Sequence, residues 1–279
     1  MSETEAMPDI RREVRSNTGL LRGLYGRAWF RKSLVFLLLA LIWQGYALVL
    51  NNQLLFPTFT ATVGALWDGM ANGELLARAW FSLHILLLGY VAGMACAALL
   101  VLFALSSQFG ADLLHALTAM LNPLPAIALL PLALIWFGLG NGSIVFVLVH
   151  SVLWPVALNT HSGFLSVSQT LRKVGRNYGL TGLRYVVHIL VPAALPSIFA
   201  GLKMGWAFAW RTMIAAELVF GVSSGSGGLG WYIYENKSEL DIPAVFAGLF
   251  TVIIIGLVVE HLVFDTLEKH TIRRWGMQG

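Results

Sequence analysis

What the sequence lacks narrows the class of protein. Charged residues make up only 11% of the 279-residue chain, whereas hydrophobic residues make up 57%. Soluble domains carry about 25% charged and about 45–50% apolar residues, so the composition indicates an integral membrane protein. The single cysteine, Cys96, lies in an apolar run, which excludes an intrachain disulfide.

Motifs for covalent chemistry are also missing. No G-x-x-x-x-G-K-[ST] motif occurs, so any ATP must be bound and hydrolysed by another chain. No histidine lies at a metal-ligand spacing such as H-E-x-x-H, and no paired acids or serine–histidine motif supports an intramembrane enzyme. Residues 225–230 match G-x-G-x-x-G, but they lie between two apolar runs rather than in a βαβ unit, which favours a flexible outer loop. We therefore predict no enzyme activity, no metal and no cofactor bound by this chain.

Six apolar runs dominate the chain. A helix needs about 20 mostly apolar residues to cross a bilayer, and backbone polar groups exposed to lipid require helices. The sequence therefore predicts an all-α polytopic membrane protein with six transmembrane helices, at residues 33–50, 80–105, 113–137, 143–161, 192–219 and 242–264. Pro123, Pro125 and Pro131 predict a kink or break near residues 122–125 of the third helix. The more polar residues 51–79 are expected to form a short outer helix or lip.

The basic residues predict the orientation. Seven lie before the first apolar run, four between residues 162 and 191, and three near the C-terminus, against only Arg78 and Lys237 on the opposite side. Both termini and residues 162–191 are therefore expected in the cytosol, and this distribution argues against nucleic-acid binding. The first run lacks a signal cleavage site and is expected to remain as a span. The expected organisation is a tail at 1–32, one membrane domain at 33–264 and a tail at 265–279.

A basic, acid-free segment at residues 169–192 has the pattern of a docking element. Residues 170–178 are expected to form a helix, and Gly179 a turn with positive φ. Leu180, Leu183 and Val187 then recur at helical spacing beside Arg184, and Pro192 marks the return to the membrane. A short exposed helix with an apolar edge suits a groove on a partner. The alternative is an ordinary basic loop that obeys the positive-inside rule.

This segment resembles the permease subunits of binding-protein-dependent ABC importers. Their signature reads Glu-Ala-Ala, three residues, Gly, nine residues, Ile, one residue, Leu-Pro. The spacing matches throughout, although the first three residues depart from the pattern; the matching positions are Lys173, Val174, Gly175, Gly179, Ile189, Val191 and Pro192. The flanking residues resemble the nitrate, sulfonate and taurine subgroup at 131–140, 191–198, 201–203, 215–218 and 228–230.

The resemblance implies partners and a docking site. It implies a homodimer of permeases in the bacterial cytoplasmic (inner) membrane, cytoplasmic ATPase subunits that bind ATP and magnesium, and a periplasmic or lipid-anchored solute-binding protein. The residues expected to dock the ATPase are Lys173, Val174, Gly175, Gly179, Leu180, Leu183, Arg184 and Pro192.

The fifth apolar run carries the candidate pathway residues. An ionisable group at membrane depth costs about 2.5–3.5 kcal/mol on insertion scales and usually faces a cavity or a partner. Arg211 is expected either to attract an anion or to pair with a carboxylate such as Glu217, six residues away and off the helical pairing register. A structural hydrogen bond is the favoured role for Glu217, whereas Lys203 is expected to snorkel. Trp206 and Trp210 either line the pathway beside Arg211 or simply pack.

The function expected from these features is import of a small anion by ATP-driven alternating access. Sulfonate, taurine, nitrate and carboxylates all remain open as the solute. The alternative is an ion-coupled secondary transporter, which predicts inverted repeats and discontinuous helices. An intramembrane enzyme is a further alternative that lacks a catalytic constellation.

Overall fold

The computed structural model describes residues 28–220 and 227–273, and every element in these ranges is helical. The predicted all-α class is thereby confirmed. Within the described residues, four helices are long and apolar enough to cross a membrane, and there are up to six spans if each of two bent helix pairs counts as one. The chain divides into two compact units between Val63 and Gly64, and each is described separately.

The described part of the first unit consists of helix α2 (Ala28–Leu50) and the start of α3 (Phe59–Ala71). Most apolar side chains of α2 are exposed, as expected for a helix that faces lipid. The Trp43 indole N–H donates to the Pro57 carbonyl over 2.9 Å, and the Thr60 N–H donates to the Gln44 side-chain carbonyl over 3.2 Å. These bonds hold the loop after α2 against the end of that helix. The helix α3 confirms the one expected within residues 51–79.

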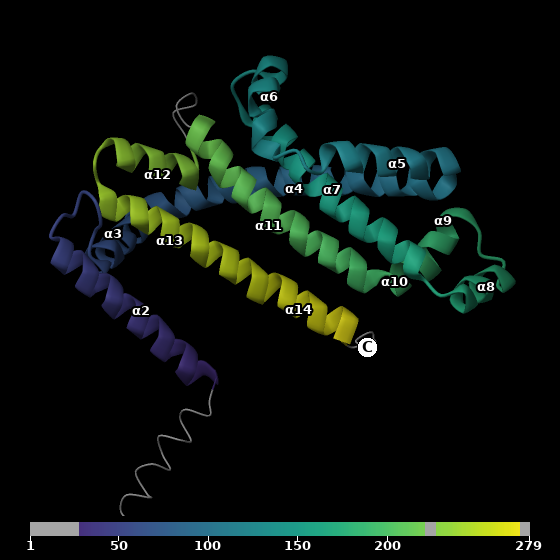
Figure 1. Ribbon diagram of the computed structural model, residues 1–279, viewed down its shortest axis with the longest axis horizontal. Helices are drawn as coiled ribbons and strands as arrows, with labels where there is room; N and C mark the ends of the chain where they lie inside the picture. The colour runs from purple at the N-terminus through teal and green to yellow at the C-terminus, as the bar shows by residue number, and fades with distance from the viewer. Residues whose placement is uncertain (1–27, 221–226, 274–279) are drawn as a thin grey trace, which may run out of the picture. The chain divides into compact units, whose positions relative to one another are not determined.

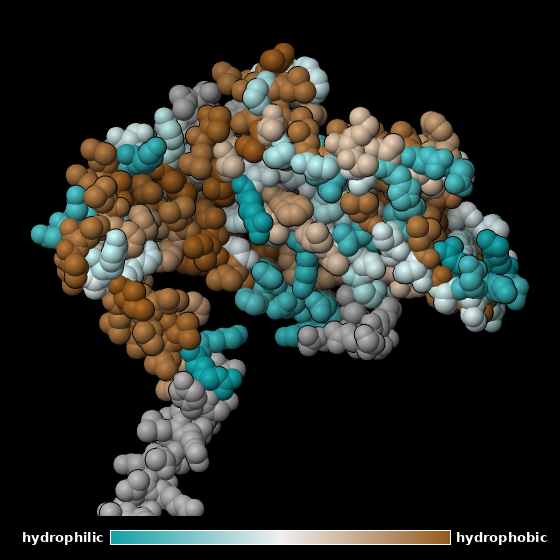
Figure 2. All heavy atoms as spheres, viewed as in Figure 1, coloured by the Kyte–Doolittle hydropathy of each residue, from teal (hydrophilic) through white to brown (hydrophobic). Residues whose placement is uncertain are grey.

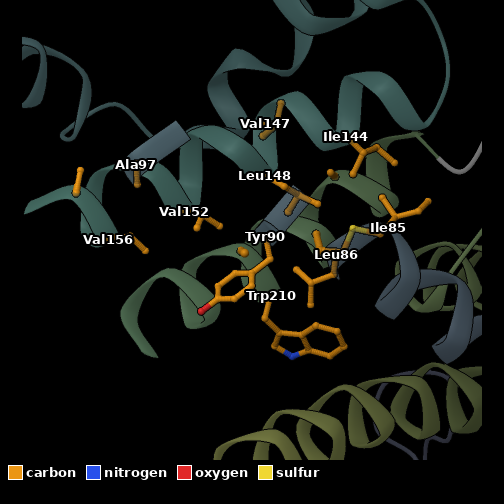
Figure 3. Close-up of a cluster of buried hydrophobic side chains, with 14 of the residues drawn as sticks. Ile85, Leu86, Tyr90, Ala97, Ile144, Val147, Leu148, Val152, Val156 and Trp210 are labelled. Atoms are coloured by element: carbon orange, nitrogen blue, oxygen red, sulfur yellow. The ribbon is translucent and has the colours of Figure 1, made fainter. Parts of the chain in front are cut away.

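Three long helices form the core of the second unit: α4 (Glu74–Ser106), α7 (Asn141–Ser166) and α11 (Leu195–Phe220) (Figure 1). Helix α7 packs against both of the others. Figure 3 shows the apolar side chains of α4 and α7 meeting in this core, with Tyr90 and Trp210 beside them. The Tyr90 hydroxyl also donates to the Leu202 carbonyl over 2.9 Å, so a polar bond joins α4 to α11.

Small residues set the close approach of these helices. A Cβ atom at Gly93 of α4 would lie 2.7 Å from Cβ of Val152, and one at Gly89 would lie 2.5 Å from Cβ of Leu148. On α11, a Cβ atom at Gly201 would lie 2.8 Å from Cβ of Asn159. Glycines spaced four residues apart let helices pack closely within a bilayer, where water does not drive their association.

The third predicted span is broken more sharply than a kink. Helix α5 (Gln108–Leu121) ends just before the prolines, and the chain resumes as η1 (Ala126–Leu129) and α6 (Leu130–Phe137). The two parts are bent by 89°. The break at residues 122–125 is thus confirmed, since proline cannot donate the backbone bonds that would continue the helix.

The fifth predicted span begins later than expected. After α8 (Gln169–Asn177) come α9 (Gly182–Tyr185), η2 (Val186–Leu190), which is a π-helix, and α10 (Val191–Ala193). This helical segment is bent by 79° from α11, so the straight part of the span starts at Leu195 rather than at residue 192. The helix expected from the spacing of Leu180, Leu183 and Val187 is present, but it starts at Gly182 and the helical segment continues to Ala193.

The last two elements also differ from the expected pattern. The flexible loop expected at residues 225–230 lies partly outside the described ranges. Helix α12 (Leu229–Ser238) begins within residues 225–230 and was not predicted. The sixth span is longer than 242–264: α13 (Ile242–Val258) continues through η4 (Val259–Phe264) and α14 (Asp265–Glu268) into η5 (Lys269–Arg273).

Candidate docking segment and translocation cavities

Helix α8 is held at its start by hydrogen bonds to the end of α7. The Ser168 hydroxyl accepts from the Leu171 N–H over 3.3 Å and caps the helix. The Arg172 guanidinium donates to the carbonyl of Val167 over 3.0 Å and also to that of Phe164. Two bonds from one planar group fix α8 to the helix that precedes it.

Gly179 ends α8 with the geometry expected from the sequence. Its φ is +72°, the left-handed conformation in which glycine has no steric penalty. The Leu180 N–H donates to the Gly175 carbonyl over 3.1 Å, and the Gly179 N–H to the Arg176 carbonyl over 2.9 Å. This pair of bonds is a Schellman motif, in which the residue after the cap is usually glycine. The prediction of a positive φ at Gly179 is confirmed.

Gly175 joins α8 to the segment that leads into α11. It is buried, and a Cβ atom there would lie 2.8 Å from Cγ1 of Ile189 and 3.1 Å from Cε2 of Tyr185. Two positions of the sequence signature, Gly175 and Ile189, therefore contact each other across α8 and η2. This close contact packs α8 directly against η2.

The remaining docking residues form the outer surface of this segment. Lys173, Val174, Leu183 and Arg184 are exposed, with Leu183 at 65% exposure. Leu180 and Pro192 are half-buried. Figure 2 shows hydrophilic side chains gathered at this end of the second unit. The surface thus combines basic groups with exposed apolar side chains, as a docking helix requires, and the assignment to an ATPase stays a prediction.

Arg211 of α11 lines two cavities, each of about 370 Å³. The first, here called the tryptophan cavity, lies between α11 and the α13–η4 segment, and Trp206 and Trp210 line it beside Arg211. The three residues expected to lie together therefore do so. The second, here called the proline cavity, was not predicted; it is lined by Asn122, Pro123, Leu124, Pro125, Ala126, Ile127, His150, Ser151, Trp154, Pro155, Phe208, Arg211, Thr212 and Ala215.

Arg211 has no carboxylate partner among the described residues. Glu217 instead lies in a separate buried cluster, with 2% of its surface exposed. Its carboxylate accepts from the Ser82 hydroxyl and from the Gly230 N–H, both over 2.8 Å, and the Leu229 N–H donates to the Ser82 hydroxyl over 2.9 Å. The expected structural hydrogen bond at Glu217 is confirmed, whereas the alternative in which Arg211 pairs with Glu217 is wrong, because the Glu217 carboxylate bonds to Ser82 and Gly230 instead. A pathway role for Glu217 stays a prediction.

The Glu217 cluster fixes the start of α12 against α4 and α11. A Cβ atom at Gly230 would lie 2.6 Å from Cβ of Glu217, so only glycine fits without a shift. Arg78 of α4 adds an ion pair to Glu235 of α12 at 2.9 Å. This ion pair could not be predicted from the sequence, because Glu235 lies 157 positions from Arg78.

Lys203 forms ion pairs that the sequence did not predict, and its expected snorkelling stays a prediction. Its ammonium pairs with the Glu268 carboxylate at 2.8 Å and with the Asp265 carboxylate at 3.7 Å, which ties α11 to α14. The sequence does not indicate this pair, because 65 residues separate Lys203 from Glu268.

Helices long enough to span a membrane, an exposed basic segment and two partly open cavities beside Arg211 are together typical of a membrane transport subunit. Residues 85–274 match the family described as the inner membrane component of binding-protein-dependent transport systems. The match covers more than half of the chain, so the chain belongs to this family and is a multi-pass inner membrane protein rather than an enzyme.

The relatives support the same subgroup as the sequence pattern. The chain is 29% identical over 221 residues to the aliphatic sulfonates transport permease SsuC of Escherichia coli, covering 78% of this chain and 82% of that protein. It is 28% identical over 247 residues to the nitrate import permease NrtB of a Synechocystis species, covering 86% and 88%. It is 32% identical over 139 residues to the taurine permease TauC of Escherichia coli, covering 50% and 49%. The resemblance to ABC importer permeases of the nitrate, sulfonate and taurine type is confirmed.

Proposed function

We propose that this chain is the permease subunit of an ABC importer that moves a small anion into the cytoplasm by ATP-driven alternating access. The observation that carries the anion proposal is Arg211: a cation within a membrane-spanning helix, facing two cavities, with no acidic side chain within 4.0 Å among the described residues. An ionisable group at this depth is usually functional or paired. The similarity to sulfonate, nitrate and taurine permeases supports the same class of solute.

The proposed topology has six spans, with each bent helix pair counted as one. The membrane domain extends over residues 33–264, between cytoplasmic tails at 1–32 and 265–279. The segment at 169–192 then faces the cytosol between spans four and five, where its basic surface docks an ATPase subunit that binds ATP and magnesium. Family membership implies a solute-binding protein outside the membrane, and a second copy of this chain completes the proposed permease dimer.

The proposed coupling runs from α8 to α11. Closure of the ATPase subunits moves α8, the Gly175–Ile189 contact carries this motion to η2, and η2 leads through the 79° bend into the helix that bears Arg211. The nucleotide shifts the equilibrium only by binding one of the two conformations more tightly. This chain itself forms and breaks no covalent bond.

The test of this function is affinity purification of the chain in mild detergent, followed by mass spectrometry, an ATPase assay and uptake in vesicles. An ATPase with a P-loop should co-purify in stoichiometric amount, and Arg211→Gln should lower anion uptake while that ATPase stays bound. A chain that purifies without an ATPase and still transports would overturn the proposal.

One observation favours a second candidate function, that of an ion-coupled secondary transporter. The helix broken by 89° at residues 122–125 lines a cavity, as discontinuous helices do in ion-coupled secondary transporters. That candidate predicts uptake driven by an ion gradient when ATP and the ATPase are absent. Uptake that stops without ATP excludes it.

A further inference from the structure

Apart from Arg211, the residues that line the proline cavity have no role in the function proposed above. The helix break contributes residues 122–127, α7 contributes His150, Ser151, Trp154 and Pro155, and α11 contributes the side that contains Arg211. Three helical elements thus converge on one space at the place where the third span is interrupted. Interrupted helices at membrane depth are tolerated where they border a cavity.

The polar groups around this cavity include donors without acceptors. The indole N–H of Trp154, a residue only 6% exposed, has no hydrogen-bond partner among the described residues. The His150 ring lies edge-on to Trp154 at 5.9 Å between ring centres, beside the Leu121 backbone, and neither of its nitrogens reaches hydrogen-bonding geometry. Burying a polar group without a partner costs about 1–3 kcal/mol, and a ligand in the cavity gains that energy at Trp154 once the ring shifts to present its buried N–H.

The charge of the cavity selects the sign of such a ligand. Arg211 is the one charged residue among those that line it, and no aspartate or glutamate does. The tryptophan cavity differs, because Glu260 and Lys203 line it together with Arg211. A solute in the proline cavity therefore meets a positive charge that no lining carboxylate offsets.

The rest of the wall is mostly apolar, apart from Asn122 and the hydrogen-bonded pair Ser151 and Thr212. Pro123, Pro125 and Pro155 form part of it with Phe208, and the volume of about 370 Å³ exceeds the roughly 30 Å³ that one water molecule occupies more than tenfold. Binding sites for organic ligands are typically mostly apolar with a few placed polar groups. A small inorganic anion would leave most of this wall without contacts.

We propose that the proline cavity binds an organic oxyanion with an apolar body, such as an aromatic sulfonate or carboxylate. Arg211 and the Trp154 N–H hold the oxyanion, while the body lies against the proline wall and Phe208. This inference rests on the proposed import function and specifies its solute class: an organic anion rather than nitrate.

The test is direct binding to the purified full-length chain, with any co-purifying subunits, in detergent by titration calorimetry. The probes are benzenesulfonate, nitrate and, as a cation of similar size, benzylammonium. Benzenesulfonate should bind, nitrate should bind at least about tenfold more weakly because it lacks the apolar body, and benzylammonium should not bind.

Four variants locate the site. Arg211→Gln should weaken benzenesulfonate binding about tenfold to a hundredfold, as expected for a lost charged hydrogen bond, whereas Arg211→Lys should weaken it less. Trp154→Phe keeps an aromatic ring, although a smaller one, removes the N–H and should cost about threefold to tenfold. Ala215→Leu narrows the cavity without changing its charge and should weaken binding at least about tenfold. Trp80→Phe removes an indole N–H from an exposed position on α4 and is the matched control, with unchanged affinity.

The outcomes separate this inference from the import function. Absence of benzenesulfonate binding, equal affinity for nitrate, or unchanged binding in both Arg211→Gln and Ala215→Leu overturns the site. In each of these cases a co-purifying ATPase and ATP-dependent uptake would leave the importer proposal standing. Loss of the ATPase together with intact benzenesulfonate binding would instead overturn the importer proposal alone.

Discussion

The turn at Gly179 offers a test in which backbone conformation and side-chain packing separate cleanly. Gly179 has φ +72°, and a Cβ atom placed there would meet nothing within 4 Å. A substitution therefore costs energy only through the backbone. A left-handed conformation costs most L-residues about 1–2 kcal/mol, asparagine tolerates it, and for valine it is a genuine outlier.

The perturbation is the pair Gly179→Val and Gly179→Asn. In the valine variant the left-handed turn competes with conformations that break the Schellman bonds of Leu180 and Gly179. A cost of about 1.4 kcal/mol lowers the equilibrium for the turn about tenfold. If the ATPase docks on the closed turn, its apparent affinity falls with the fraction of closed turn, by up to about tenfold, because only the binding-competent fraction contributes. The asparagine variant should stay close to the wild-type affinity.

The assay is binding of the co-purified ATPase to the permease in lipid nanodiscs, with ATP-dependent uptake measured in parallel. Thermal unfolding of each variant is the control, because the change lies on an exposed turn and should leave the core intact. Wild-type affinity in Gly179→Val would refute the reasoning, since the turn would then not limit docking. Equal loss in both variants would also refute it, because glycine would then be needed for something other than its φ.

Two further predictions concern the packing of the second unit. Gly93→Leu should destabilise the unit by at least about 1–3 kcal/mol through overpacking against Val152. Gly64→Leu is the control, because the new side chain has free space and should not destabilise the unit. Thermal unfolding in detergent measures both variants, and equal stability would contradict the close approach of the helices at Gly93. Glu217→Ala should lower the free energy of unfolding by about 1–3 kcal/mol for each buried donor left without an acceptor, at Gly230 and Ser82, and should expose α12 to proteolysis. The control is Glu239→Ala at an exposed position, which should stay within about 0.5 kcal/mol of wild type. An unchanged unfolding temperature in Glu217→Ala would show that the cluster does not hold α12.

Local rules predicted the features whose cause lies within a few residues. Pro123 and Pro125 lack the N–H groups that a continuous helix needs, so the break between α5 and η1 could be inferred directly. The turn at Gly179 could be inferred in the same way, because its partners Gly175 and Arg176 lie within the same turn of chain.

Features that depend on distant partners escaped prediction. Helix α12 is polar enough to resemble a loop, and its start is held by Ser82 and Glu217 from two other helices. The ion pair of Lys203 could not be inferred, because its partner Glu268 lies 65 positions away on α14. The extent of the helical segment before α11 also follows from contacts, since Ile189 packs on Gly175.

The sequence by itself determined the membrane class, the apolar runs, the basic docking segment with its glycine turn, and the family to which the chain belongs. Only the tertiary structure decided which ionisable residues share a space. Six residues along a helix correspond to a rotation of about 240°, so Arg211 and Glu217 point to different neighbours although they are close in sequence. Arg211 thereby lines the cavity made by the broken helix and α7, while Glu217 accepts hydrogen bonds from α4 and α12. The pairing of faces between helices depends on packing over the whole chain, and no local pattern encodes it.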